Sequence, residues 1–169
     1  IQTNVEHGKI YLKGEEKASG TTTSVPDGSS NTVSYTADAG YYISSVKVST
    51  DGGASWEEKL SSATRESITL DPTTGNNIIS VKFSHYGVKP TVTNGSIKVD
   101  GAEKAGGTTV WKALGDSTSV TFSANAGYGL KDAGNVGNAI GTSGGTRGST
   151  SFTATFRTSN ADTLYEPYA

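Results

Sequence analysis

The sequence predicts an all-β fold made of two small modules in tandem, and three observations support this. Apolar residues alternate with polar ones, which is the period of a half-buried strand, and no stretch has a convincing helical period. Asn-Gly and Asp-Gly dipeptides, which readily adopt the positive φ angles of tight turns, separate the alternating stretches. Residues 8–41 align with residues 95–128 at a constant offset of 87, with sixteen of the 34 positions identical. Because a repeat of this size indicates a copied fold, we expect two β-sandwich-like modules, either Ig-like or β-grasp-like.

The first module, residues 1–87, is predicted to contain five main strands. Its turns are expected at Lys13-Gly14, Asp27-Gly28 and Asp51-Gly52. The alternation is interrupted at Ser44-Ser45, so we expect a disturbed strand register there. The alternating apolar residues are Ile10 and Leu12, Val33 and Tyr35, Ile43, Val46 and Val48, Ile68 and Leu70, and Ile79, Val81 and Phe83.

The second module, residues 88–160, repeats the first half of this pattern and diverges after Tyr128. Pairing Phe156 with Phe83, at an offset of 73, aligns the last strands of the two modules. This pairing predicts that a hairpin of module 1 is shortened or replaced by the glycine-rich segment 134–148, either as a functional loop or by erosion of a terminal repeat. Residues 161–169 are expected to form a C-terminal tail. The alternating apolar residues of module 2 are Ile97 and Val99, Val120 and Phe122, and Phe152, Ala154 and Phe156.

Composition narrows the classes of function. The net charge is −2 and neither half is strongly basic, so we expect no nucleic-acid partner. No apolar stretch is long enough to cross a membrane, so we expect no membrane insertion. The chain has no cysteine, which excludes disulfides and thiolate chemistry and is compatible with an extracellular location. It begins at Ile1 rather than at an initiator methionine, so we expect flanking domains in a larger parent protein.

One compact motif lies in module 1, between Ser49 and Trp56. It fits the Asp-box pattern S-x-D-x-G-x-[ST]-W, and it resembles the hairpins that recur in sialidase propellers and other secreted proteins. Asp51 is expected to bond backbone amides of the turn, Gly53 to relax the backbone, and Trp56 to pack beneath the hairpin. Since a propeller needs several copies, a single copy indicates a structural hairpin.

Catalysis and metal binding have little support. His7 and His85 are the only histidines, neither recurs in the repeat, and no nucleophile elbow accompanies them. Oxygen-bearing side chains cluster at 71–77 and 132–138, but neither cluster has the spacing of a calcium loop. We therefore predict a protein that is not an enzyme and has no cofactor and no metal site.

Aromatic residues are the best candidates for binding contacts. Exposed rings stack on sugars or on protein partners. Trp111 takes the place of Ser24 and so belongs to module 2 alone; the alternative is a packing role in the core or between modules. Tyr41 and Tyr128 recur after Ala-Gly and are expected to be buried. The predicted contact residues are Trp111, Trp56, Tyr11, Tyr42 and Tyr86.

The glycines and alternating apolar residues resemble the divergent internalin-type B repeats of bacterial surface proteins. Repeats of that family read G-x-V-x-V-x-G, then T-x-x-A-x-x-G-Y-x-x-x-x-V-x-V, and end on V-x-F. In module 1 the matching residues are Gly8, Ile10, Leu12, Gly14, Tyr35, Ala37, Gly40, Tyr41, Val46, Val48, Val81 and Phe83. In module 2 they are Gly95, Ile97, Val99, Gly101, Phe122, Ala124, Gly127 and Tyr128, and the match ends there.

The resemblance implies small all-β modules in secreted or wall-attached bacterial proteins, and it brings no catalytic residue. We therefore expect a non-catalytic extracellular module that acts in adhesion or partner binding, with a glycan or a surface protein as partner, or as a spacer. Two alternatives stay open: a carbohydrate-binding module that uses exposed Trp and Tyr residues, and a structural subunit of a phage or pilus.

Overall fold

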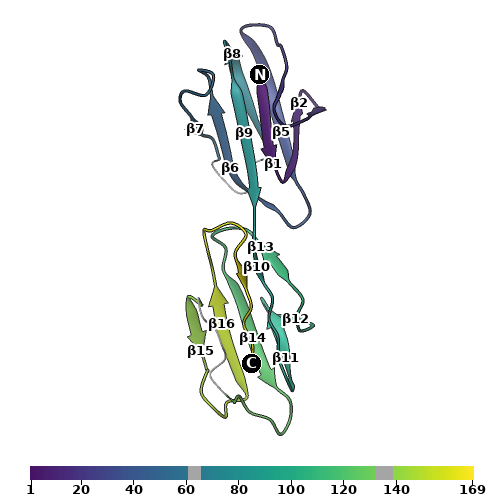
Figure 1. Ribbon diagram of the computed structural model, residues 1–169, viewed down its shortest axis with the longest axis vertical. Helices are drawn as coiled ribbons and strands as arrows, with labels where there is room; N and C mark the ends of the chain where they lie inside the picture. Colours follow the sequence, from purple (N-terminus) through teal and green to yellow (C-terminus); the bar gives the residue numbers. More distant parts are fainter. Residues whose placement is uncertain (61–65, 132–138) are drawn as a thin grey trace. The chain divides into compact units, whose positions relative to one another are not determined.

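The computed structural model describes residues 1–60, 66–131 and 139–169. The all-β prediction is confirmed: these residues form strands and turns and contain no helix. Consequently, no described helix could cross a membrane. The chain divides into two compact units, Ile1–Ser84 (unit 1) and His85–Ala169 (unit 2), which are described separately (Figure 1).

The described residues of unit 1 form two sheets. The first has the order β4-β1-β9-β6-β7 and the second the order β3-β2-β5-β8. Among its described strand pairs, β1 and β9 run parallel and all others run antiparallel. The strands are β1 (Gln2–Glu6), β2 (Gly8–Leu12), β3 (Glu15–Lys17), β4 (Thr21–Thr22), β5 (Ser29–Ala37), β6 (Tyr42–Ser49), β7 (Glu57–Glu58), β8 (Ser67–Thr73) and β9 (Ile78–Ser84).

In unit 2, residues 85–131 and 139–169 also form two sheets, with the orders β13-β10-β17 and β12-β11-β14-β16-β15. Here β10 and β17 form the parallel pair. The strands are β10 (Tyr86–Val88), β11 (Gly95–Val99), β12 (Ala102–Lys104), β13 (Val110–Lys112), β14 (Thr118–Ala124), β15 (Gly141–Ser143), β16 (Ser151–Phe156) and β17 (Leu164–Tyr165).

Each unit has its own core, which draws residues from both of its sheets. In unit 1, Ile10 and Val33 of one sheet share a cluster with Val46 and Val81 of the other. All the alternating residues named above are buried except Ile43, which is partly buried. The expected irregularity near Ser44 is confirmed, because the β6–β9 register shifts between Ile43 and Ser45. Removing these faces from water is the main force that holds each pair of sheets together.

Two glycines fix how the hairpin strands β2 and β11 meet their neighbours. A Cβ at Gly8 would lie 2.4 Å from the carbonyl oxygen of Thr36, and a Cβ at Gly95 would lie 2.6 Å from that of Ser123. Gly8 and Gly95 correspond at the offset of 87, and so do the two carbonyls. The repeated glycine is therefore required by a close backbone approach that both units share.

The predicted alignment of Phe83 with Phe156 is wrong, because the two residues lie on strands that do not correspond. Val33 pairs with Ile68 in unit 1, and its counterpart Val120 pairs with Ala154 in unit 2. Strand β16 is therefore the counterpart of β8, at an offset of 86, and not of β9. An apolar-x-Phe ending fits both strands, because the period of a strand does not reveal its neighbours.

The expected boundaries at 87/88 and 160/161 also differ from the structure. Tyr86 and Val88 form β10, which pairs inside unit 2. Residues 161–169 include β17 and continue alongside the segment that follows β10, with Thr91 opposite Tyr168. The expected tail thus contains the last strand of unit 2, β17, and lies beside the first strand as β9 does in unit 1.

Candidate functional site

The predicted contact residues do not gather in one place. Trp56 and Tyr42 lie in unit 1, with 44% and 40% of their surface exposed, and Trp111 lies in unit 2 with 40% exposed. Tyr11, on β2, is half-buried. Each unit therefore has to be considered as a separate binding surface.

Tyr86 is a core residue, and the prediction that it is a surface contact is wrong. Its side chain is fully buried. Its hydroxyl donates to the backbone oxygen of Asp116 at 2.7 Å and lies 2.6 Å from the hydroxyl oxygen of Thr118. Burial raises the pKa of Tyr86. The alternation of β10 explains the placement, since the Tyr86 and Val88 side chains enter the core, while Gly87 between them faces the other side of the sheet, where Trp111 and Leu164 cover it.

The Asp-box motif forms a hydrogen-bonded turn in unit 1. Asp51 Oδ1 accepts from the Ser55 amide at 2.9 Å and from the Ser49 hydroxyl at 2.7 Å, and Asp51 Oδ2 accepts from the Ser55 hydroxyl at 2.5 Å. Ser49 Oγ in turn accepts from the amide of Gly53 at 2.8 Å. These hydrogen bonds, above all those from Ser55, hold the pKa of Asp51 well below its usual range.

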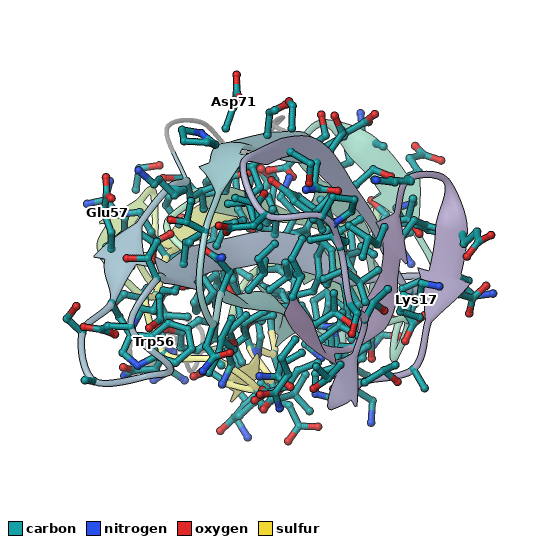
Figure 2. The ribbon with its side chains drawn as sticks, turned by 90° about the horizontal axis from the view of Figure 1, so that it is seen from above. Lys17, Trp56, Glu57 and Asp71 are labelled. Carbon is teal, nitrogen blue, oxygen red and sulfur yellow. The ribbon has the colours of Figure 1, made fainter. Side chains whose placement is uncertain are left out.

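Trp56 differs from its expected place. It lies close to the turn at Gly53, yet its exposed fraction of 44% shows that it is not buried beneath the hairpin. It lines a shallow groove of about 320 Å³ with Glu57, Lys59 and Asp71. Figure 2 shows Trp56 and Glu57 on the side of unit 1 opposite Lys17, and the Asp71 side chain directed away from the body of the unit. Lys59 and Glu57 form an ion pair of 2.5 Å, so the groove offers one ring and a mixed set of charges.

Trp111 belongs to a row of three residues across the outer face of the β13-β10-β17 sheet. Gly87 of β10 is opposite Trp111 on β13 and Leu164 on β17. A Cβ at Gly87 would lie 2.8 Å from the Trp111 ring and 2.9 Å from Leu164 Cδ1, so both side chains lean over the glycine. The Trp111 ring also stacks on His85, with centroids 4.1 Å apart and planes 10° apart.

Unit 2 has a groove of about 770 Å³ with two exposed tyrosines on its border. Tyr128 is 54% and Tyr168 is 53% exposed, while Phe122 and Leu130 supply buried apolar surface. The prediction that Tyr128 is buried is therefore wrong. Its counterpart Tyr41 is partly buried and stacks on His7, with centroids 4.4 Å apart.

Leu164 and Tyr168 are absent from the predicted contacts because residues 161–169 are expected to form a tail. The signal that could have found them is the apolar pair Leu164-Tyr165, since a unit that copies the first needs a strand in the place of β9. The glycine-rich segment 134–148 lies partly outside the described residues. The oxygen-rich cluster at 132–138 lies wholly outside them.

Groups with catalytic or metal-binding chemistry are sparse in the described residues. His7 stacks on Tyr41, and His85 stacks on Trp111 with its Nε2 3.6 Å from Asp162 Oδ1. Among residues 1–60, 66–131 and 139–169, no group of three or more His, Cys, Asp or Glu side chains is placed to hold a metal ion. Searches with this chain against protein-family models, curated proteins and solved structures found no match.

Proposed function

We propose that this chain is a non-catalytic region of a bacterial cell-surface or secreted protein that combines partner binding with a spacer role. The observation that carries the proposal is that the two units share their strand arrangement but not their exposed aromatic residues. The two units repeat the strand register β2-β5-β8 as β11-β14-β16, and they repeat a parallel pairing of first and last strands. Their exposed aromatic residues do not repeat. A copied frame with divergent surfaces supports binding and spacing more than a shared reaction.

A second candidate, carbohydrate binding, is favoured by the row of Trp111, Gly87 and Leu164. The indole is held on a strand, stacks on His85 and lies beside a residue without a side chain. A flat ring with 40% of its surface exposed offers a sugar ring an apolar face to stack on. Because strands hold the row in place, little ordering is needed when a ligand binds.

A polysaccharide co-sedimentation series tests both candidates. If carbohydrate binding is the function, wild-type protein co-sediments with at least one insoluble glycan and Trp111→Ala reduces the bound fraction about tenfold or more, as expected for an aromatic hot spot. Trp56→Ala, an equally exposed tryptophan in unit 1, is the matched control. Wild-type protein that binds no glycan would remove the carbohydrate candidate.

The broader proposal predicts binding of a surface protein or attachment in series with other domains. Trp111→Ala and Trp56→Ala with unchanged binding to a captured protein partner would place the contact elsewhere. A hydrolytic activity that co-purifies with the protein through several steps would contradict the non-catalytic assignment.

A further inference from the structure

In both units the first and last strands lie side by side and run in the same direction. In unit 1, β1 pairs with β9 over five successive residues, from Gln2 opposite Ile78 to Glu6 opposite Lys82. Figure 1 shows these two strands next to each other with their arrows pointing the same way, so that the chain enters unit 1 at one end and leaves β9 at the other. Such an arrangement determines how a pulling force would act on the unit.

We propose that each unit is a load-bearing clamp, which resists tension applied between its ends through the parallel pair of first and last strands. Tension along the chain pulls the two parallel strands past each other lengthwise. All hydrogen bonds between them are then stretched together. In an antiparallel pair pulled from one end, by contrast, the bonds lie perpendicular to the strands and break one after another.

In unit 2 a series of backbone hydrogen bonds joins the first strand to the last. The amides of Gly87, Lys89, Thr91 and Thr93 donate in turn to the carbonyl oxygens of Thr163, Tyr165, Pro167 and Ala169, over 2.8–3.0 Å. The amide of Ala169 donates back to Thr91 at 3.2 Å, and the amide of Asp162 donates to His85 at 2.9 Å. In unit 1 the amide of Gln2 donates to Asn77 at 2.8 Å, which matches the bond from Lys89 at the offset of 87.

One difference between the two clamps lies at Pro167. The backbone of Thr91 donates to Pro167 and accepts from Ala169. The ladder repeats every two residues, so the backbone of Lys89, which donates to Tyr165, would accept from the amide of residue 167. Pro167 has no N–H and cannot supply this bond. Its counterpart in unit 1 is Ile79, because Asn4 lies opposite Ser80 as Thr91 lies opposite Tyr168. The clamp of unit 1 is therefore expected to be the stronger.

The path of the force between the clamps is short. Strand β9 ends at Ser84 and β10 begins at Tyr86, so tension passes from the last strand of one unit to the first strand of the next through the backbone of His85 alone. A load therefore acts on both clamps in series. This inference extends the proposed spacer role, but its test requires no ligand.

Attachment geometry gives the decisive experiment. The chain has no cysteine, so two introduced cysteines define where the full-length protein is pulled. Gln2→Cys with Lys82→Cys loads the β1–β9 pair along its length. Tyr42→Cys with Lys82→Cys pulls from one end of the antiparallel β6–β9 pair, in which Tyr42 lies opposite Ser84. We expect a severalfold higher rupture force for the first pair in single-molecule pulling, and equal forces would overturn the proposal.

A proline variant tests the ladder itself. Asn4 is the counterpart of Thr91 and lies in the middle of the β1–β9 ladder, so Asn4→Pro removes a central N–H. When this variant is pulled through cysteines at positions 2 and 82, the lifetime of the folded unit under constant load should fall about fivefold. This is the effect of one ordinary hydrogen bond on a rate. Lys59→Pro is the control, because it removes the bond from Lys59 to Val46, which lies outside the clamp.

An unchanged lifetime in a folded Asn4→Pro variant, or an equal fall in Lys59→Pro, would contradict the ladder as the origin of resistance. Failure of the clamp would leave the glycan and partner-binding tests unaffected. Absence of any ligand would likewise leave the pulling experiment unaffected.

Discussion

In unit 1, β9 lies between β1 and β6, whereas in unit 2 the described neighbour of β17 is β10. On the other sheet, β8 is the last of the described strands, while its counterpart β16 pairs with the further strand β15. The strands that enclose the core correspond, and those that differ come after Tyr41 and Tyr128. The comparison shows that closure by the first and last strands is common to the two copies, while the segments that follow the repeated half vary.

The largest effect is expected from deleting residues 161–169. Tyr165 is buried against Tyr86 and Phe156, with ring centroids 6.0 Å and 5.0 Å apart, and β17 pairs with β10. Loss of this strand and its aromatic packing should unfold unit 2, since removing one large buried ring alone costs about 3–5 kcal/mol. Hydrogen exchange measured by mass spectrometry should show unprotected amides in unit 2 and protected ones in unit 1.

Unit 1 serves as the internal control for this deletion, because its last strand, β9, is intact. Retained protection of β11, β14 and β16 would show that the two units do not close in the same way.

The next effect tests whether the shared glycine has the same role in both units. Gly8→Ala and Gly95→Ala each place a methyl group against a backbone carbonyl, which cannot move as a side chain end can. We expect about 1–3 kcal/mol of destabilisation from each, confined to the unit that carries it. Denaturant unfolding followed by unit-resolved hydrogen exchange measures both.

Gly141→Ala, where an added Cβ meets no atom within 4 Å, is the matched control. A Gly95→Ala variant as stable as this control would break the equivalence of the two sites.

A smaller effect distinguishes the hairpin of unit 1. Ser49 is buried and accepts the amide of Gly53 at 2.8 Å, so Ser49→Ala leaves that amide without its acceptor. The expected cost is about 1 kcal/mol, restricted to unit 1. Thermal unfolding with exchange of residues 49–58 reports it, and Ser96→Ala, an exposed serine on β11, should change nothing.

The smallest effect is the pH dependence of the same hairpin. Hydrogen bonds from Ser55 and Ser49 lower the pKa of Asp51 in the folded state. Its contribution to stability is therefore complete above the unfolded pKa, near 4, and is lost as the pH falls through the folded pKa. Protection of the amides of residues 49–58, taken relative to the intrinsic exchange rate at each pH, should fall below about pH 4 in wild type, and the fall should be smaller in Asp51→Asn. The same fall in both would exclude Asp51 as its cause.

Much of the frame could be predicted because strands with one buried face carry a period of two. This period placed Ile10, Val33, Val46 and Val120 in the cores, and its interruption marked the irregular register near Ser44. Period alone does not reveal which strands are neighbours. For that reason Phe156 was matched to Phe83, although its strand occupies the place of β8.

The surface was less predictable. The sequence predicts Tyr86 as a contact because a tyrosine suits both a core and a surface. Its burial depends on the hydroxyl of Thr118, 32 residues away, which pairs with the phenol. Tyr128 repeats the sequence context of Tyr41 but not its environment. Leu164 lies on the two-residue strand β17, and Tyr168 forms an isolated bridge with Thr91. Neither segment is long enough to show alternation, so only tertiary pairing identifies these two residues.

The parallel pairing of β1 with β9 also dictates the order in which the protein can be built. Gln2 has to wait for Ile78, which emerges 76 residues later, before its place in the sheet is complete. Closing such a long loop is slow compared with forming a local hairpin. During synthesis the first strand of each unit therefore lacks its parallel neighbour until the last strand of that unit has been made.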